Sequence, residues 1–459
     1  MTEQTFLNQI TRQLEASVEA GSLQAWSLTT TVSRSLQRLY ASPDGESLSC
    51  HQSRRVDSES FKLSVYTPSK EEGMVGTAML DLAPYHPIDQ QLKEAITLAG
   101  GSQNKAWKLA KAPIVEPPSV ETCDPAVRDN PEGVALQIED QFRTAFATTA
   151  GCRINSAELF VNYITTSVIN SEGLSYETEL SELYLETAME KAGQDNDKEV
   201  HEHATSVTVD DLNVAGFIAD CALQVSVLGE SEEPETTDNA SILIDKEALS
   251  QMLDAVLEQL NCVNEYLKLP FMNTGDRLGG GYGDTLSLQL DPTITCMVLS
   301  SAYAADGLPA KGGMLIENNE VTNRIIGNRF GQYLGLEANG ISGNLIVEPG
   351  TLSRDSLEGM NYVEVIKFSS LLIDSRKLTW SSEIKLGRHM AADGTVTLVK
   401  GGVVSGNLKE NFIDCKFSST LGNVNVPKSS YAPPLGYRGP DAMLITRGVS
   451  IAGQTKGEN

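Results

Sequence analysis

The spacing of apolar residues changes several times along the chain and separates stretches of predicted helix from stretches of predicted strand. The clearest stretch runs from Ile242 to Leu267, where a short apolar run leads into residues that recur at three- and four-residue steps. This period predicts a strand followed by a helix of about five turns with one buried face. That face comprises Leu249, Met252, Leu253, Val256, Leu257, Leu260, Val263 and Leu267. Asp254, Glu258 and Glu265 are predicted to lie on its exposed face.

The N-terminal quarter alternates between a helical period and a strand period. Residues 3–20 predict an amphipathic helix with Thr2 as its N-cap. Residues 26–66 are rich in Leu, Thr, Val and Tyr and predict strands interrupted at Pro43-Asp44-Gly45. A further hairpin around Glu72-Gly73 and a helix over 87–98 follow. This alternation predicts an α+β fold.

Residues 112–131 contain five prolines and predict a linker without regular structure. Helix resumes over 132–148, and two strands flank a tight turn at 170–173. The polar run 191–203 predicts a loop. Residues 230–238 hold five acids and no base, which is typical of a solvated boundary.

Beyond Leu286 the pattern becomes short strands separated by glycine-rich turns, which predicts a largely β C-terminal domain. The predicted organisation is an N-terminal domain over 1–111, the linker 112–131, a middle segment 132–238 that continues the N-terminal domain, and a C-terminal domain over 239–459.

Charge and cysteine usage narrow the functional class. The formal charge of −26 disfavours direct binding of nucleic acid, because phosphate backbones would be repelled. The first twenty residues lack the basic start and apolar run of a signal peptide, and no stretch is apolar enough to suggest a membrane span. Seven scattered cysteines without C-x-x-C spacing favour reduced thiols, so we expect a cytoplasmic protein.

Several short segments follow the strand and helix at 242–267 in a fixed order. They are Leu278-Gly279, Asp291-Pro292-Thr293, Asp306-Gly307, 314–319, 333–336, 344–350, 401–408 and 441–453, and the turn Asn170–Gly173 precedes them. This order resembles the TldD/PmbA family, whose members are also known as modulators of DNA gyrase. The resemblance is strongest over about 240–453.

In TldD members the corresponding helix carries H-E-x-x-x-H, which supplies two imidazoles to a metal and a carboxylate base. An ungapped match places Asp254 and Gln259 at the two histidine positions, and a small slip places Leu257 and Cys262 there. Asp254 and Glu258 are one turn apart and could pair as acid and base, although such carboxylates are usually only solvated. The family's C-terminal cysteine ligand is also missing from 421–426, LGNVNV. The resemblance therefore implies a TldE-like member without the metal.

Two other stretches are candidates for chemistry. His201-Glu202-His203 is the one local cluster of metal-ligand types, but it lacks a local third ligand and more simply belongs to an exposed loop. The glycine-rich stretch Gly279-Gly280-Gly281-Tyr282-Gly283 lacks P-loop spacing, so we expect a flexible turn whose mobile backbone could contact a substrate. No G-x-S-x-G occurs, which leaves serine hydrolase chemistry unsupported.

We therefore predict a non-catalytic TldE-type subunit that shapes a chamber and binds peptide for a metal-bearing TldD-like partner. This chain is expected to hold no cofactor, with zinc in the partner subunit. Two alternatives remain open at this point. One is a metal-dependent peptidase with divergent ligands from His201, His203 and a cysteine. The other is a homodimer or larger homo-oligomer that binds peptide or protein without hydrolysis. An acidic surface that imitates DNA is a further, weaker alternative.

Overall fold

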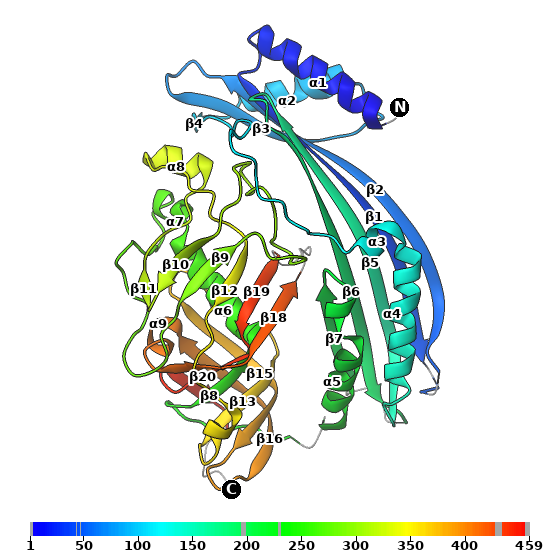
Figure 1. Cartoon of the computed structure of the whole chain (residues 1–459), viewed down its shortest axis with the longest axis vertical. Coiled ribbons are helices and arrows are strands. Elements are labelled where there is room, and N and C mark those ends of the chain that lie inside the picture. The colour runs from blue at the N-terminus through cyan, green and yellow to red at the C-terminus, as the bar shows by residue number, and fades with distance from the viewer. Residues whose placement is uncertain are drawn as a thin grey trace.

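The computed structural model describes residues 3–42, 44–45, 47–193, 199–227, 231–426 and 434–454. The predicted N-cap Thr2, the turn residue Pro43 and Glu230 of the acidic run lie outside these residues. A long curved sheet forms one side of the molecule, and the C-terminal domain lies beside it (Figure 1). The fold is α+β, as the alternation of patterns predicts.

The long sheet has seven antiparallel strands in the order β4-β3-β2-β1-β5-β6-β7. Its strands are β1 (Ala25–Ser42), β2 (Ser49–Pro68), β3 (Met74–Leu82), β4 (Asn104–Lys105), β5 (Cys152–Asn170), β6 (Ser175–Lys191) and β7 (Glu199–Ser206). Residues 152–206 therefore join the N-terminal hairpin in one sheet. The predicted strands at both hairpins are confirmed, and each is longer than the sequence pattern indicates.

Helices bury one face of this sheet at its two ends. Even-numbered residues of β1, from Trp26 and Leu28 to Leu36 and Tyr40, face two separate cores. The helices at the first end are α1 (Glu3–Glu19) and α2 (Ile88–Gly100), and those at the second are α3 (Pro125–Asp129), α4 (Pro131–Phe146) and α5 (Val214–Val227). The helices predicted over 3–20, 87–98 and 132–148 are confirmed within a few residues.

The linker is more regular than its prolines suggest. Residues 125–129 form α3, because Pro125 occupies the first helical position, where a missing N–H costs nothing, and Asp124 caps the start. The Asp124 carboxylate accepts from the Ala126 amide at 2.9 Å. Asn130 caps α4 in the same way through the Gly133 amide at 3.0 Å. The expectation of an irregular segment up to residue 131 was therefore wrong for this helix.

The C-terminal domain contains a six-stranded sheet, β11-β10-β9-β12-β19-β18, and an eight-stranded sheet whose path runs β17-β20-β8-β13-β15-β16-β21 with β14 paired to β15. Helix α6 (Lys246–Leu260) contacts strands of both sheets, and its apolar face joins a core that draws on both. The strands are β8 (Ile242–Asp245), β9 (Leu288–Asp291), β10 (Gly313–Glu317), β11 (Glu320–Val321), β12 (Asn344–Val347), β13 (Tyr362–Phe368), β14 (Leu372–Asp374), β15 (Thr379–Met390), β16 (Val396–Asn407), β17 (Cys415–Phe417), β18 (Leu421–Val426), β19 (Leu435–Pro440), β20 (Ala442–Ile445) and β21 (Val449–Ala452). The remaining helices are α7 (Cys262–Tyr266), α8 (Asn328–Leu334) and α9 (Leu408–Asn411), with 3-10 turns at Asp210–Leu212 and Arg354–Leu357.

The single helix expected up to Leu267 is interrupted at Asn261. The Asn261 backbone is extended, with φ −88° and ψ 131°, and its side chain accepts from the Val263 amide to start α7. Asn favours such caps because its short side chain competes for backbone donors. The break turns Leu267 outward, so its predicted burial was wrong: its exposed fraction is 54%. In the part of the chain that the structure describes, no helix is long and apolar enough to cross a membrane.

Candidate functional site

The helix positions singled out by the sequence are engaged in contacts within the domain. Gln259 is buried, and its amide nitrogen donates to the carbonyls of Ser375 at 2.6 Å and Arg376 at 3.1 Å. Glu258, on the exposed side, accepts from the Ser375 hydroxyl. The turn that follows β14 therefore lies over this part of α6, and side chains of α6 form hydrogen bonds with it.

The other helix positions do not converge on this turn as ligands. Asp254 is half-buried, and burial followed by the nearby Glu258 charge raises its pKa. Leu257 packs against the C-terminal core. Cys262 is fully buried, and burial raises the pKa of its thiol. A thiol that stays protonated is a poor metal ligand and a poor nucleophile.

These residues do not fit the metal that the family's motif would bind. The amide of Gln259 already satisfies two carbonyls, and neither register offers an imidazole. Among the described residues no group of three or more His, Cys, Asp or Glu is arranged to hold a metal ion. We derive no chemical step through a metal in this chain.

The segment at the family's C-terminal cysteine position is also used for packing. Asn425 of β18 accepts from the Val298 amide at 2.7 Å and donates to the Cys296 carbonyl at 3.3 Å. Its own carbonyl accepts from the Thr205 hydroxyl of β7 at 3.0 Å. Asn425 thus connects the C-terminal domain to the long sheet. Cys415 lies on β17 with its side chain in the core.

Backbone hydrogen bonds hold the glycine-rich stretch along its length. The amides of Gly280, Tyr282 and Asp284 donate to the carbonyls of Phe412, Ile413 and Cys415 at 3.1, 3.1 and 2.8 Å. A Cβ on Gly279 or Gly283 would lie 2.2 or 2.1 Å from one of these carbonyl oxygens. The glycines therefore allow two backbones to approach closely. Only the Tyr282 side chain projects to solvent, with an exposed fraction of 84%.

His201 and His203 lie on β7, so the expected loop over 191–203 was wrong for residues 199–203. Residues 194–198 lie outside the described part. Both histidines are exposed: His201 lies 3.1 Å from a Glu186 oxygen, and His203 stacks on Tyr184 with centroids 5.7 Å apart. Period-two alternation turns Glu202 the other way, into the junction between the domains.

Glu202 is the centre of a buried ionic bridge that the sequence analysis did not identify. Its carboxylate lies 2.7 Å from Lys367 Nζ of β13 and 3.3 Å from Lys385 Nζ of β15, and its side chain is 7% exposed. Burial acts to lower the pKa of Lys367, but Glu202 and then Glu247 more than offset it, so that pKa is raised. The alternation of Val200, Glu202 and Ala204 would have revealed the inward position of Glu202 once a strand was recognised.

A cavity of about 330 Å³ adjoins this bridge, between β7 and α5 on one side and β8, β13 and β15 on the other. Arg354 and Arg388 both pair with Glu364 on its wall, at 3.0 and 3.5 Å. Asp245, which also caps α6 through the Ala248 amide, has its pKa raised to about 6 by burial and then by Glu247. The cavity is therefore lined both by paired charges and by further carboxylates, among them Asp220 and Glu247.

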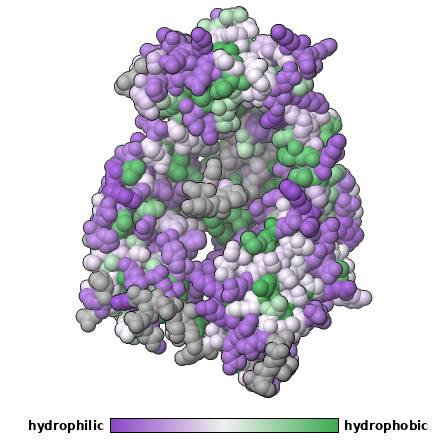
Figure 2. Space-filling view, turned by 180° about the vertical axis from the view of Figure 1, so that it is seen from behind, coloured by the Kyte–Doolittle hydropathy of each residue, from purple (hydrophilic) through white to green (hydrophobic). Residues whose placement is uncertain are grey.

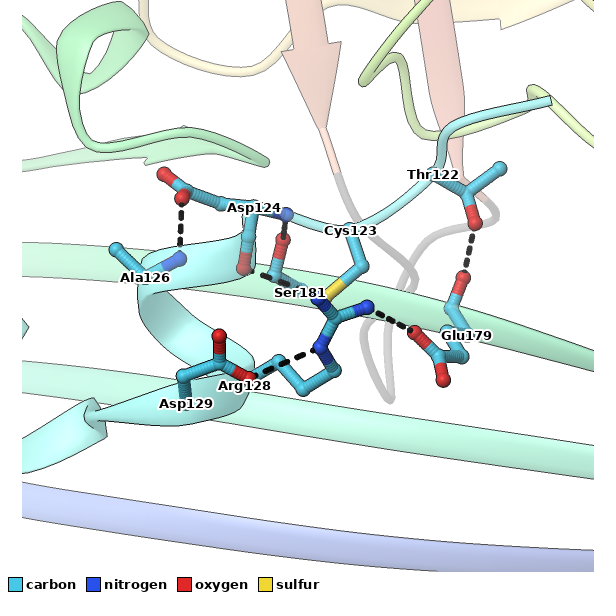
Figure 3. Close-up of polar contacts among 8 residues, drawn as sticks. All are labelled: Thr122, Cys123, Asp124, Ala126, Arg128, Asp129, Glu179 and Ser181. Carbon is cyan, nitrogen blue, oxygen red and sulfur yellow. Dashed lines mark hydrogen bonds and ion pairs between the residues drawn. The ribbon is translucent and has the colours of Figure 1, made fainter.

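The end of the linker lies between the sheet and the C-terminal domain (Figure 3). The Asp124 amide donates to Ser181 Oγ at 2.8 Å, and Ser181 in turn donates to the Val207 carbonyl at 2.7 Å. Cys123 is buried beside them, and burial raises its pKa to about 11. On the other side the Cys296 amide donates to the Glu121 carbonyl at 2.7 Å. Seen from behind, the surface is hollowed between the sheet and the C-terminal domain (Figure 2).

Comparisons with known proteins agree with this architecture. Residues 237–439 match the family model described as the PmbA/TldA metallopeptidase C-terminal domain. No curated protein matches the sequence.

Three solved structures extend the likeness to nearly the whole chain. TldE from Thermococcus kodakarensis superposes with a TM-score of 0.76 at 12% identity, covering 97% of this chain and 100% of that one. A protein provisionally named a modulator of a DNA gyrase from Thermotoga maritima gives 0.74 at 16% identity, with 97% and 100% covered. A protein with a similar provisional name from Bacteroides thetaiotaomicron gives 0.76 at 16% identity, with 99% and 100% covered. At such identities the likeness establishes a shared fold.

Proposed function

This chain belongs to the PmbA/TldD family through its C-terminal domain, and from that premise we propose that it is a TldE-type, non-catalytic subunit. It would assemble with a metal-bearing TldD-type partner in a cytoplasmic peptidase complex. Its role in the complex would be to bind an unfolded peptide and to enclose the partner's catalytic site.

The observation that carries this proposal is that side chains of α6 form hydrogen bonds within the domain at the positions where a metal ligand would be needed. Where the resemblance implies two histidines, Gln259 is committed to the Ser375 and Arg376 carbonyls, and Glu258 accepts from Ser375. Restoring a ligand at position 259 would leave two carbonyls without their donor, which is unfavourable at a buried position. We therefore infer that α6 has a structural role in this chain and that hydrolysis takes place in another subunit.

The hollow between the long sheet and the C-terminal domain supports the peptide-binding part of the proposal (Figure 2). An unfolded peptide could lie there in extended form.

The test is to purify the full chain and measure its metal content, its mass in solution and its hydrolysis of an unfolded peptide. The same measurements follow after mixing it with a TldD-type protein from the same organism. We expect no hydrolysis by the chain alone, and a stable mixed complex that cleaves the peptide.

Two controls separate this proposal from its alternatives. A TldD-type partner whose H-E-x-x-x-H glutamate is replaced by glutamine should still form the complex but lose hydrolysis, which assigns the chemistry to the partner. Stoichiometric zinc and hydrolysis by this chain alone would instead support a divergent metallopeptidase. A stable homo-oligomer that binds peptide and ignores the partner would support the binding-protein alternative.

A further inference from the structure

Three arginines from separate elements line one small pocket on the long sheet. The pocket has a volume of about 240 Å³ and is lined by Arg34 of β1, Arg55 of β2 and Arg128 of α3, together with Tyr163 of β5. Asp129 at the end of α3 and the first residues of α4, Pro131 and Glu132, also line it. The pocket is distant in sequence from α6 and shares no residue with the helix positions discussed above.

The strand register brings these side chains together. Arg34 lies directly opposite Tyr163 in the pairing of β1 with β5, and Leu36, two residues along β1, lies opposite Arg55 of β2. Residues two apart on a strand point to the same face, so Arg34 and Arg55 project toward the helices that cover this end of the sheet. Arg128 approaches from α3.

Two of the three guanidinium groups are only partly engaged by protein carboxylates. Arg55 pairs with Asp57 at 3.2 Å and Glu132 at 3.4 Å. Arg128 pairs with Asp129 at 3.1 Å and Glu179 at 3.4 Å, as Figure 3 shows. Each guanidinium has five N–H donors, so both retain donors after these contacts.

Arg34 is the third and has no acidic partner among the residues that the structure describes. It is exposed, and within the described ranges it makes neither an ion pair nor a side-chain hydrogen bond. Asp57 lies opposite it across the β1–β2 pair, but the Asp57 carboxylate is directed to Arg55. Arg34 therefore presents its whole fork of donors at the pocket.

The pocket is less acidic than the chain as a whole. The formal charge of the protein is −26, whereas the pocket lining holds three arginines and two carboxylates, Asp129 and Glu132. Both carboxylates are paired with Arg128 or Arg55, which leaves Arg34 for a ligand. The positive end of the α4 dipole also lies at the pocket, since Pro131 and Glu132 begin that helix. An anion in this pocket would meet the donors of Arg34 and the start of α4.

We propose that this pocket binds an anionic oxygen group, a carboxylate or a phosphate, through Arg34 with Arg55 and Arg128 beside it. Guanidinium forks match both groups in a bidentate manner, and the 240 Å³ volume suits a group of this size. The inference is independent of the proposed subunit role, because it concerns a different part of the chain and requires no partner.

The test is a titration of the full chain alone with inorganic phosphate. Binding is measured as broadening of the phosphate resonance in phosphorus NMR. A short peptide with a free α-carboxylate and the same peptide as its C-terminal amide are then titrated by calorimetry. We expect saturable binding of phosphate that Arg34→Ala weakens about tenfold, the loss of roughly one charge-assisted hydrogen-bonded contact. Arg34→Lys should recover part of the affinity, because it retains charge without the fork.

Arg12→Ala is the matched control, since Arg12 is an exposed arginine on α1 without a partner among the described residues. Binding of the carboxylate peptide but not of its amide would identify a peptide terminus as the source of the anion. Binding of phosphate alone would identify a phosphate group. Absence of saturable binding by all three ligands would overturn the proposal, as would equal affinity of Arg34→Ala and the unaltered chain in samples with the same circular dichroism spectrum.

Discussion

Two of the contacts between the long sheet and the C-terminal domain have opposite chemical character. At one, Trp107 lies against Tyr66 and Tyr333 with ring centroids 5.1 and 6.0 Å away, and the Arg329 guanidinium carbon lies 4.2 Å from the Trp107 centroid. At the other, Glu202 of β7 holds Lys367 and Lys385 at 2.7 and 3.3 Å. We call these the aromatic contact and the ionic contact.

The two contacts are expected to differ in how strongly they depend on pH and salt. The aromatic contact adds neutral hydrogen bonds, such as those from Gln332 and Asn328 to the Lys108 carbonyl at 3.0 and 2.9 Å, and depends little on pH or salt. The ionic contact lies beside a cavity lined by several further charged residues. Its strength is therefore expected to depend on the protonation of these residues and on salt. One of these contacts thus depends mainly on shape and the other on charge.

The largest expected effect comes from removing Trp107. Trp107→Ala deletes the ring that Tyr66, Tyr333 and Arg329 contact, and we expect a loss of about 3 kcal/mol, the range for truncating a large aromatic side chain. Differential scanning calorimetry and hydrogen exchange at the amides of residues 105–110 would measure it. Ile114→Ala, in the linker that follows Trp107, is the control, because Ile114 is fully exposed. Similar behaviour of the two variants would contradict the assignment.

A smaller loss is expected at the ionic contact. Glu202→Gln leaves two lysine ammonium groups beside each other without their carboxylate, and we expect a cost of about 2 kcal/mol, below the range for fully buried pairs because both lysines reach solvent. A double-mutant cycle with Lys367→Met would measure the coupling by thermal unfolding. Glu199→Gln on the same strand is exposed and serves as control. A coupling near zero would mean that this bridge contributes nothing to the attachment.

Hydrophobic periodicity was sufficient for most of the fold, because amphipathic helices and long hairpins carry a local pattern. The helices at both ends of the sheet and the strands of its two hairpins appear where the pattern places them. The break at Asn261 depends on a side-chain cap and on an isolated bridge from Asn261 to Ile325, 64 residues further on. A contact at that separation leaves no periodic trace in the sequence.

The candidate site was less accessible to sequence reasoning. The absence of ligands at Asp254 and Gln259 could be recognised from the residues alone, but the engagement of Gln259 by Ser375 and Arg376 depends on a turn more than a hundred residues away. Glu202 was hidden because the polar run around it suggested a loop. A strand with charged residues on both faces lacks the apolar alternation by which strands are recognised.

The last prediction concerns Asp245, at the charged cavity beside the ionic contact. Burial and then Glu247 raise the pKa of Asp245 from 3.8 to about 6, so the folded state favours the neutral carboxyl more than the unfolded state does. The stability of the folded state with a neutral Asp245 is fully present below about pH 4. It is lost as the pH rises through 6, where this carboxyl ionises in the folded state. At pH 7.5 the carboxylate of Asp245 therefore destabilises the fold.

Asp245→Asn removes this penalty and keeps the cap, because an asparagine oxygen can also accept from the Ala248 amide. We expect the variant to be more stable at pH 7.5 by about 1.5 kcal/mol, discounted because the carboxylate is partly exposed. The gain should shrink at pH 5, where the unaltered carboxyl is mostly protonated. Thermal unfolding at both pH values measures this, with Asp89→Asn as the control, an exposed aspartate in the first turn of α2. A gain that is the same at both pH values would show that Asp245 acts through packing, and the pH response of this contact would then belong to its other charges.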